Sequence, residues 1–233
     1  MTFGMLVIGH RGASRAHPEN TLAAFAGAIA LGADGIELDV RRTSDGAMAL
    51  SHEDTLSDGR ILRDVPHSEL PAEMPVLAEA LEVCEPLVMV NIEIKNWPDD
   101  QDFDPTEVLA GAVVDLLGSR GELGSNRYLV SGFHLPTVDR VHELASTLAT
   151  AWLVIGNEDL AGQVDRAAEH GHRAIHPHHA FVNEEVVGRA HRAGLAVNTW
   201  TCDEPDRIRW FAEIGVDAVV TNVPDVALAA LGR

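Results

Sequence analysis

The chain has 233 residues, and 17 Lys and Arg against 36 Asp and Glu give it a formal net charge of −19 at pH 7. This length fits one large domain or two small ones. A field of this sign repels nucleic acids and anionic membrane surfaces at long range, so no nucleic acid partner is expected, and an anionic substrate needs local positive charge or a metal.

Short apolar runs alternate along the whole chain with longer stretches of helical period. Strands are predicted at residues 6–10, 35–40, 87–94, 127–131, 150–155, 173–177, 195–200 and 217–221. Helices are predicted to begin near Pro18, Val76, Pro105, Pro136, Glu158, Asn183, Glu204 and Asp225. Repeated βα units of this number predict a (β/α)8 TIM barrel, with residues 1–233 as a single domain. A doubly wound open sheet is the alternative, because the sequence does not show whether the first and last strands pair.

Residues 47–75 depart from this rhythm. They contain an extra strand, predicted to end at His52, and then a polar stretch with prolines and no clear periodicity. We interpret this region as a small insertion after the second strand.

Acidic side chains alternate with apolar ones in the second and third strands. In GIELDVR, Glu37, Asp39 and Arg41 share one face, and in NIEIK, Glu93 and Lys95 share one face. Buried carboxylates side by side need a partner, because unpaired charges are costly to desolvate. Either a divalent cation with oxygen ligands or a base such as Arg41 or Lys95 could neutralise them.

The carboxyl-terminal mouth of a barrel is where such side chains would converge. Glu37, Asp39 and Glu93 there predict a site for a hard cation, most simply Mg²⁺ or Ca²⁺. His10 ends the first strand as His52 ends the extra one, so two imidazoles are expected in the same half of the barrel. One imidazole can accept a proton while the other donates one near neutral pH.

Taken together, these motifs resemble a known family. HRGA, PENT, GIELDVRRTSDG, the histidine at 52 and IEIK, in this order, resemble the glycerophosphodiester phosphodiesterase family, and VNTWTCDEPDRIRWFAEIGVDAVVTNVPD resembles its closing pattern. The family consists of (β/α)8-barrel hydrolases that cleave phosphodiesters with a bound divalent cation. The resemblance implies hydrolysis of a small glycerophosphodiester to glycerol 3-phosphate and an alcohol, with Mg²⁺ or Ca²⁺, or Mn²⁺, as cofactor.

The resemblance also implies a role for each matching position. Acid/base catalysis falls to His10 and His52, metal binding to Glu37, Asp39 and Glu93, and phosphate binding to Arg11 and Lys95. Trp200, at the end of the seventh strand, is predicted to wall the pocket and pack on the glycerol or alcohol moiety, with core packing as the alternative.

Some positions depart from the family pattern. Glu53 follows His52 directly where Asp is usual, and Asp58 stands where an Arg is usual, with Arg60 as a candidate substitute. These departures leave the substrate contacts of the insertion open. Asn222 stands where Asp is common, and we expect that change to matter less.

Two other functions stay open. One is a phosphodiesterase acting on lysophospholipids or other phosphodiesters, and the other is a non-catalytic phosphoester-binding barrel. The histidines of HPHH, residues 176–179, lack the spacing of a zinc site.

The cysteines and the N-terminus indicate a cellular location. Cys84 and Cys202 are far apart and match no disulfide framework or zinc motif. The stretch MTFGMLVIGH lacks the basic and long apolar regions of a signal peptide, and no run approaches ~18 apolar residues. We predict a cytoplasmic protein without a stable membrane anchor; oligomeric state is not predicted.

Overall fold

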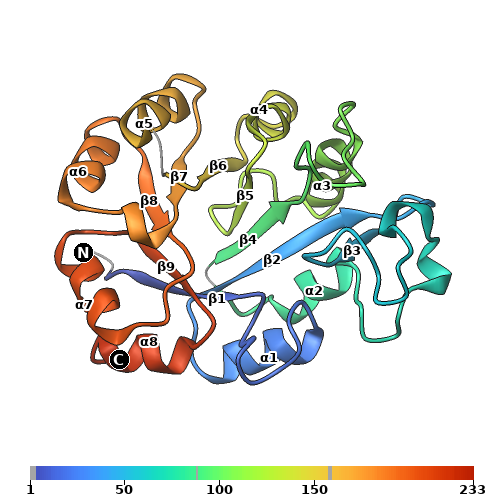
Figure 1. The fold of residues 1–233 in the computed structure, drawn as a ribbon, viewed down its shortest axis with the longest axis horizontal. Coiled ribbons are helices and arrows are strands. Elements are labelled where there is room, and N and C mark those ends of the chain that lie inside the picture. Colours follow the sequence, from blue (N-terminus) through green and yellow to red (C-terminus); the bar gives the residue numbers. More distant parts are fainter. Residues whose placement is uncertain (1–3, 88, 157–158) are drawn as a thin grey trace.

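The computed structural model describes residues 4–87, 89–156 and 159–233, and every predicted strand is present within two residues of its predicted bounds. The strands are β1 (Leu6–His10), β2 (Gly35–Arg42), β3 (Met48–Leu50), β4 (Met89–Ile94), β5 (Tyr128–Gly132), β6 (Ala149–Val154), β7 (Ala174–Pro177), β8 (Ala196–Thr199) and β9 (Ala218–Thr221). Figure 1 shows these strands surrounded by helices, with β3 outside the ring.

The helices begin within four residues of the predicted positions, of which Glu158 lies outside the described residues. They are α1 (Leu22–Ala30), α2 (Leu77–Val83), α3 (Val108–Ser119), α4 (Leu135–Leu144), α5 (Leu160–Glu169), α6 (Glu184–Arg192), α7 (Pro205–Glu213) and α8 (Pro224–Ala230). Among the described residues, none of the helices has the length and apolar character needed to cross a membrane.

The sheet closes on itself. In the described residues its strand order is β1-β9-β8-β7-β6-β5-β4-β2-β3, and β1 also pairs with β2. Because β1 is parallel to both β2 and β9, the eight parallel strands form a closed barrel. This confirms the (β/α)8 fold and excludes the open sheet.

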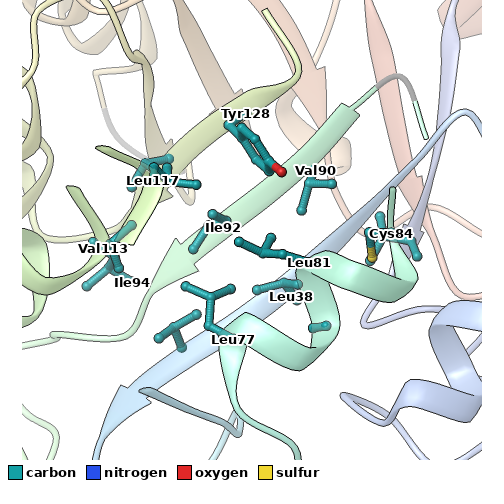
Figure 2. Close-up of a cluster of buried hydrophobic side chains, with 14 of the residues drawn as sticks. Leu38, Leu77, Leu81, Cys84, Val90, Ile92, Ile94, Val113, Leu117 and Tyr128 are labelled. Carbon is teal, nitrogen blue, oxygen red and sulfur yellow. The ribbon is translucent and has the colours of Figure 1, made fainter. Parts of the chain in front are cut away.

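Alternation along the strands separates two faces of the barrel. On the outer face, Leu38 of β2 and Ile92 of β4 pack against Leu77 and Leu81 of α2 (Figure 2). The inner face is filled toward the amino-terminal ends by apolar residues, among them Leu129, Ala151 and Ala174. The acidic residues of β2 and β4 also point inward, but toward the carboxyl-terminal mouth.

The insertion follows β2 as predicted. β3 runs antiparallel to β2, and two 3₁₀ turns, Leu62–Asp64 and His67–Glu69, follow it. The extra strand ends at Leu50, so the prediction that it ends at His52 is wrong. The chain leaves the ladder at Ser51, whose N–H donates to the Asp39 carbonyl at 3.1 Å, and His52 lies in the bend that follows. The return of β3 along β2 carries His52 back to the mouth.

The chain between β1 and α1 makes a tight turn at the mouth. Asn20 has a φ of 56°, in the left-handed region, so α1 begins at Leu22 rather than near Pro18. Gly12 has a φ of 87°, and a Cβ on Gly12 would lie 2.5 Å from the Ala24 carbonyl carbon. The close approach of α1 to β1 therefore depends on glycine at this position.

Gly12→Ala is expected to lower the free energy of unfolding by about 2–4 kcal/mol, because the methyl group meets backbone and φ is positive. Urea unfolding measures this loss. Gly46→Ala is the matched control, because Gly46 also has a φ of 87° but no described atom within 4 Å of the added Cβ. Equal losses in the two variants would show that the contact with α1 contributes nothing.

Candidate active site

Three carboxylates meet at the mouth of the barrel. In the ladder, His10 is opposite Glu37, and Asp39 is opposite Glu93. Glu37, Asp39 and Glu93 are 4%, 1% and 7% exposed. Each offers an oxygen, and these atoms lie within 4.8 Å of one another. The structure thus brings together the three acids that the alternation in β2 and β4 singled out.

The donor atoms of this cluster fit a hard cation. Oε1 of Glu37, Oδ1 of Asp39 and Oδ1 of Asn91 are buried and have no hydrogen-bond partner among the described residues. Burial, together with the charges of Asp39 and Glu93, raises the pKa of Glu37 well above its usual value. Burial also raises the pKa of Glu93. A divalent cation with oxygen ligands would satisfy these atoms and favour the charged carboxylates.

Two cationic side chains flank the acids. Lys95 Nζ donates to Glu93 Oε1 at 2.8 Å and lies 3.7 Å from Asp39 Oδ1. Arg11 Nε lies 2.9 Å from Asp39 Oδ2. Burial opposes ionisation of Asp39, but Lys95 and Arg11 outweigh it, so the pKa of Asp39 is lowered. Lys95 and Arg11 are therefore the basic side chains that form ion pairs with the acids.

Arg41, the other candidate base, has different partners. Its Nη1 donates to Asp102 at 2.6 Å, and its Nη2 donates to Asp100 at 2.9 Å and to the His52 carbonyl at 2.8 Å. The guanidinium thereby fixes the bend that carries His52 and joins it to the loop after β4. Sequence reasoning missed this role because Asp100 and Asp102 follow no secondary-structure period.

His10 is held by a chain of polar side chains. Its Nδ1 lies 2.7 Å from Asn222 Oδ1, while Asn222 Nδ2 donates to Asp203 Oδ2 at 2.8 Å. Since the amide nitrogen is committed to Asp203, Asn222 Oδ1 accepts the proton of Nδ1. His10 Nε2 is then free to exchange a proton, and it lies 4.0 Å from Glu37 Oε2. Burial and the charge of Arg11 lower the pKa of His10.

Asn222→Asp is expected to raise the pKa of His10, because a carboxylate beside Nδ1 favours the imidazolium. The limb of the kcat/KM profile that reports His10 should then move to higher pH. A pH series on both proteins measures this shift. An unchanged profile would mean that Asn222 does not control the pKa of His10. That result would agree with the expectation from the sequence that Asn in place of Asp at position 222 matters less.

His52 lies at the edge of an open cavity of about 500 Å³, which is also lined by Lys95, Trp97 and Phe133. Its side chain is 35% exposed, and its Nδ1 lies 2.7 Å from Glu53 Oε1. Glu53 is thus a direct partner of His52.

Arg60, the candidate substitute in the insertion, is engaged on the insertion itself. It pairs with Asp58 at 2.9 Å and with Glu69 at 2.7 Å. These contacts hold its guanidinium among acids of the insertion.

Aromatic rings form one wall of the mouth. The Phe133 ring meets Trp97 edge-on at 5.7 Å and Trp200 edge-on at 5.4 Å between centroids. Trp200 Nε1 donates to the His176 carbonyl at 2.7 Å. Trp200 also lines a small cavity with His10 and packs against the buried Ile8 and Val220, and its contact with the glycerol or alcohol moiety stays a prediction. Trp97 was missed because it follows β4 in an irregular segment.

Asn20 is a further residue that the sequence reasoning did not single out, although it lies in the PENT motif. Its Nδ2 donates to Asp39 Oδ2 at 2.8 Å, and its Oδ1 accepts from the Asp39 N–H at 3.2 Å. Its own N–H donates to the Arg11 carbonyl at 3.1 Å. The left-handed conformation of Asn20 thus orients Asp39 and supports the turn that carries Arg11.

A parallel barrel with its polar side chains gathered at the carboxyl-terminal mouth defines the class of (β/α)8-barrel enzymes. Residues 10–226 match the sequence model of the glycerophosphoryl diester phosphodiesterase family. The chain belongs to this family and is a phosphoric diester hydrolase.

Individual relatives are similar to this chain over nearly their whole length. A glycerophosphodiester phosphodiesterase of Bacillus altitudinis is 29% identical over 251 residues, covering 95% of this chain and 96% of the relative. The crystal structure of the Thermotoga maritima enzyme is 28% identical, with a TM-score of 0.81 and full coverage of both chains. An Oleispira antarctica phosphodiesterase, solved with the product sn-glycerol-3-phosphate, is 25% identical, with a TM-score of 0.82 and coverage of 100% and 98%.

Proposed function

We propose that the protein hydrolyses a glycerophosphodiester to glycerol 3-phosphate and an alcohol such as choline or ethanolamine, using a bound Mg²⁺, Ca²⁺ or Mn²⁺ ion. The observation that carries this proposal is the cluster of Glu37, Asp39 and Glu93 at the mouth, within 4.8 Å of one another and beside His10. The Oleispira antarctica relative was solved with this product, which supports the choice of substrate.

Glu37, Asp39 and Glu93 would hold the cation. Asn91 is opposite Glu37 in the ladder, and its Oδ1 has no hydrogen-bond partner in the part of the chain that the structure describes. When bound, the cation supplies positive charge against the non-bridging phosphate oxygens. Asn20 orients Asp39 through two hydrogen bonds. The remaining steps are carried by side chains of the protein.

Proton transfer is assigned to the two histidines. One imidazole takes the proton of the attacking hydroxyl, and the other protonates the departing alcohol oxygen. The attacking hydroxyl belongs to water or to the substrate itself, and in the second case a cyclic phosphate forms, which water then opens to give glycerol 3-phosphate. His10 is suited to exchange at Nε2, because its Nδ1 proton is committed to Asn222. His52 has its Nδ1 against Glu53 and borders the open cavity.

Phosphate binding is assigned to Arg11 and Lys95. Each already lies against Asp39, so their charges are fixed beside the place where negative charge develops. The aromatic wall of Trp97, Phe133 and Trp200 offers an apolar surface for the glycerol or alcohol moiety.

The direct test is incubation with glycerophosphocholine and glycerophosphoethanolamine in the presence of Mg²⁺, Ca²⁺ or Mn²⁺. Release of glycerol 3-phosphate is expected, and its absence with every cation would overturn the substrate assignment. Binding of cation and glycerol 3-phosphate without turnover would instead favour the non-catalytic alternative.

A lysophospholipid substrate is the second candidate, because two large apolar side chains are exposed at the cavity. Trp97 is 41% exposed and Ile155 is 49% exposed, and both line the cavity that contains His52. An acyl chain could lie across them. Turnover of lysophosphatidylcholine but not of glycerophosphocholine would select this candidate, and Trp97→Ala should then reduce it.

We also propose that the chain acts as a single catalytic domain in the cytoplasm. Cys84 and Cys202 are free and buried, which supports a reducing compartment. Cell fractionation tests the location.

A further inference from the structure

Three side chains of metal-binding type meet at the amino-terminal end of the barrel, opposite the candidate active site. His170 and His172 lie in the loop between α5 and β7, and Asp139 lies on α4. Asp139 Oδ1 is 2.8 Å from His170 Nδ1 and 3.2 Å from His172 Nε2. All three offer ligand atoms within 4.8 Å of one another.

His172 supplies an independent observation. Its side chain is 0% exposed, and its Nε2 is buried without a hydrogen-bond partner among the described residues. Its Nδ1 lies 3.0 Å from the Thr150 hydroxyl. A histidine that ligates a metal through one nitrogen commonly has its other nitrogen fixed by such a polar group. His172 Nε2 lies 3.2 Å from Asp139 Oδ1 without forming a well-directed hydrogen bond to it, and this nitrogen is the atom that a metal would satisfy.

A further imidazole lies beside this group. His142 follows Asp139 by one helical turn on α4, so both share one helix face. The His142 ring meets the His172 ring edge-on at 6.1 Å. A Cβ on Gly171 would lie 3.1 Å from His142 Nε2, so glycine leaves room for His142 between the two loop histidines.

We propose that Asp139, His170 and His172 bind a transition-metal dication, with Zn²⁺ the best match, and that His142 or water completes the coordination. Imidazole nitrogens with one carboxylate suit Zn²⁺, whereas the oxygen-only cluster at the mouth suits Mg²⁺ or Ca²⁺. Metal–ligand distances of about 2.0–2.1 Å place tetrahedral donors about 3.3 Å apart. The two separations from Asp139 Oδ1, 2.8 and 3.2 Å, differ from this value by at most about 0.5 Å, and all three ligand atoms lie within 4.8 Å of one another.

The consequence of this site is a cross-link within the barrel scaffold. The metal would join α4 to the loop that leads into β7, far from the reacting atoms. The site therefore stabilises the fold and takes no part in hydrolysis. Zn²⁺ bound here should raise the thermal unfolding temperature.

Calorimetric titration of the metal-free full chain with Zn²⁺ tests the proposal, in buffer containing excess Mg²⁺ to occupy the site at the mouth. One Zn²⁺ equivalent is expected to bind, and His170→Ala and Asp139→Asn should each weaken it by more than about tenfold. His170 is 38% exposed at its side chain, so its replacement should leave the fold intact. Mg²⁺-supported hydrolysis should be unchanged in His170→Ala.

His191→Ala is the matched control. His191 Nε2 lies 2.9 Å from Asp217 Oδ2, and its side chain is 42% exposed, but this pair belongs to no three-ligand cluster of the described residues. Unchanged Zn²⁺ binding is expected in this variant. Zn²⁺ affinity in His170→Ala equal to that of the unsubstituted protein would overturn the proposal. Anomalous diffraction at the zinc edge should show a peak between His170 and His172, and a zinc peak only at the mouth would overturn it as well.

Discussion

Alanine in place of His10 or His52 is expected to lower kcat by about 100- to 10,000-fold while leaving the affinity for the divalent cation nearly unchanged. In the proposed mechanism the two histidines move protons, whereas oxygens of Glu37, Asp39 and Glu93 bind the cation. His10 Nε2 lies 4.0 Å from Glu37 Oε2, so it contacts the edge of the acid cluster. Loss of the imidazole should therefore lower kcat much more than it lowers the affinity for the cation.

Steady-state kinetics on glycerophosphocholine, paired with calorimetric titration of Mg²⁺, Ca²⁺ or Mn²⁺, measures the two effects separately. If the histidines act as one acid/base pair, the double variant should lose little more activity than either single variant. His191→Ala, at an exposed position on α6, controls for loss of an imidazole elsewhere. A variant that keeps its turnover but loses the cation would contradict the assigned roles.

The strand pattern explains why much of the fold and of the site could be predicted. Alternation along β2 and β4 assigns Glu37, Asp39 and Glu93 to the barrel interior, because side chains on a strand alternate with period two. The parallel register then places Asp39 opposite Glu93. The number of βα units predicted a closed barrel with an open sheet as the alternative, and the pairing of β1 with both β2 and β9 decides for the barrel.

What the sequence could not predict depends on irregular segments. The end of β3 was misplaced because hairpin register depends on where the partner strand stops pairing. The contacts of Arg41 with Asp100 and Asp102 join residues about sixty positions apart through a loop without periodicity. Asn222 was expected to matter little, yet the closing turn places its side chain oxygen on His10. Such contacts follow from the path of loops in space.

The second large effect is expected from a substitution in the carboxylate cluster at the mouth. Glu37→Gln is expected to weaken cation binding by more than about 100-fold, since even the removal of a group that only supports a metal ligand commonly weakens metal binding by about 10- to 100-fold. Hydrolysis should fall by at least the same factor at limiting cation. Excess cation should restore part of the activity, because Asp39 and Glu93 remain.

The same substitution should stabilise the protein when no cation is bound. Burial and the charges of Asp39 and Glu93 raise the pKa of Glu37 above its ordinary value of 4.5. The folded state then keeps a proton that the unfolded chain has released, so stability falls as pH rises from about this value through the folded pKa. Glutamine cannot ionise, and the variant should lack this loss.

Urea unfolding in the presence of a chelator, at acidic and at neutral pH, measures the difference. The gain from Glu37→Gln should be larger at neutral pH, and added Mg²⁺ should remove it by stabilising the unsubstituted protein alone. Glu82→Gln, at an exposed position on α2, is the control and should change neither stability nor cation affinity. If Glu37→Gln instead destabilised the chelated protein at neutral pH, the three carboxylates could not be a repelling cluster that requires a cation. Glu37, Asp39 and Glu93 would then stabilise the fold without a cation, and the stability lost to their mutual repulsion, which is expected if the site is built for binding rather than for stability, would be absent.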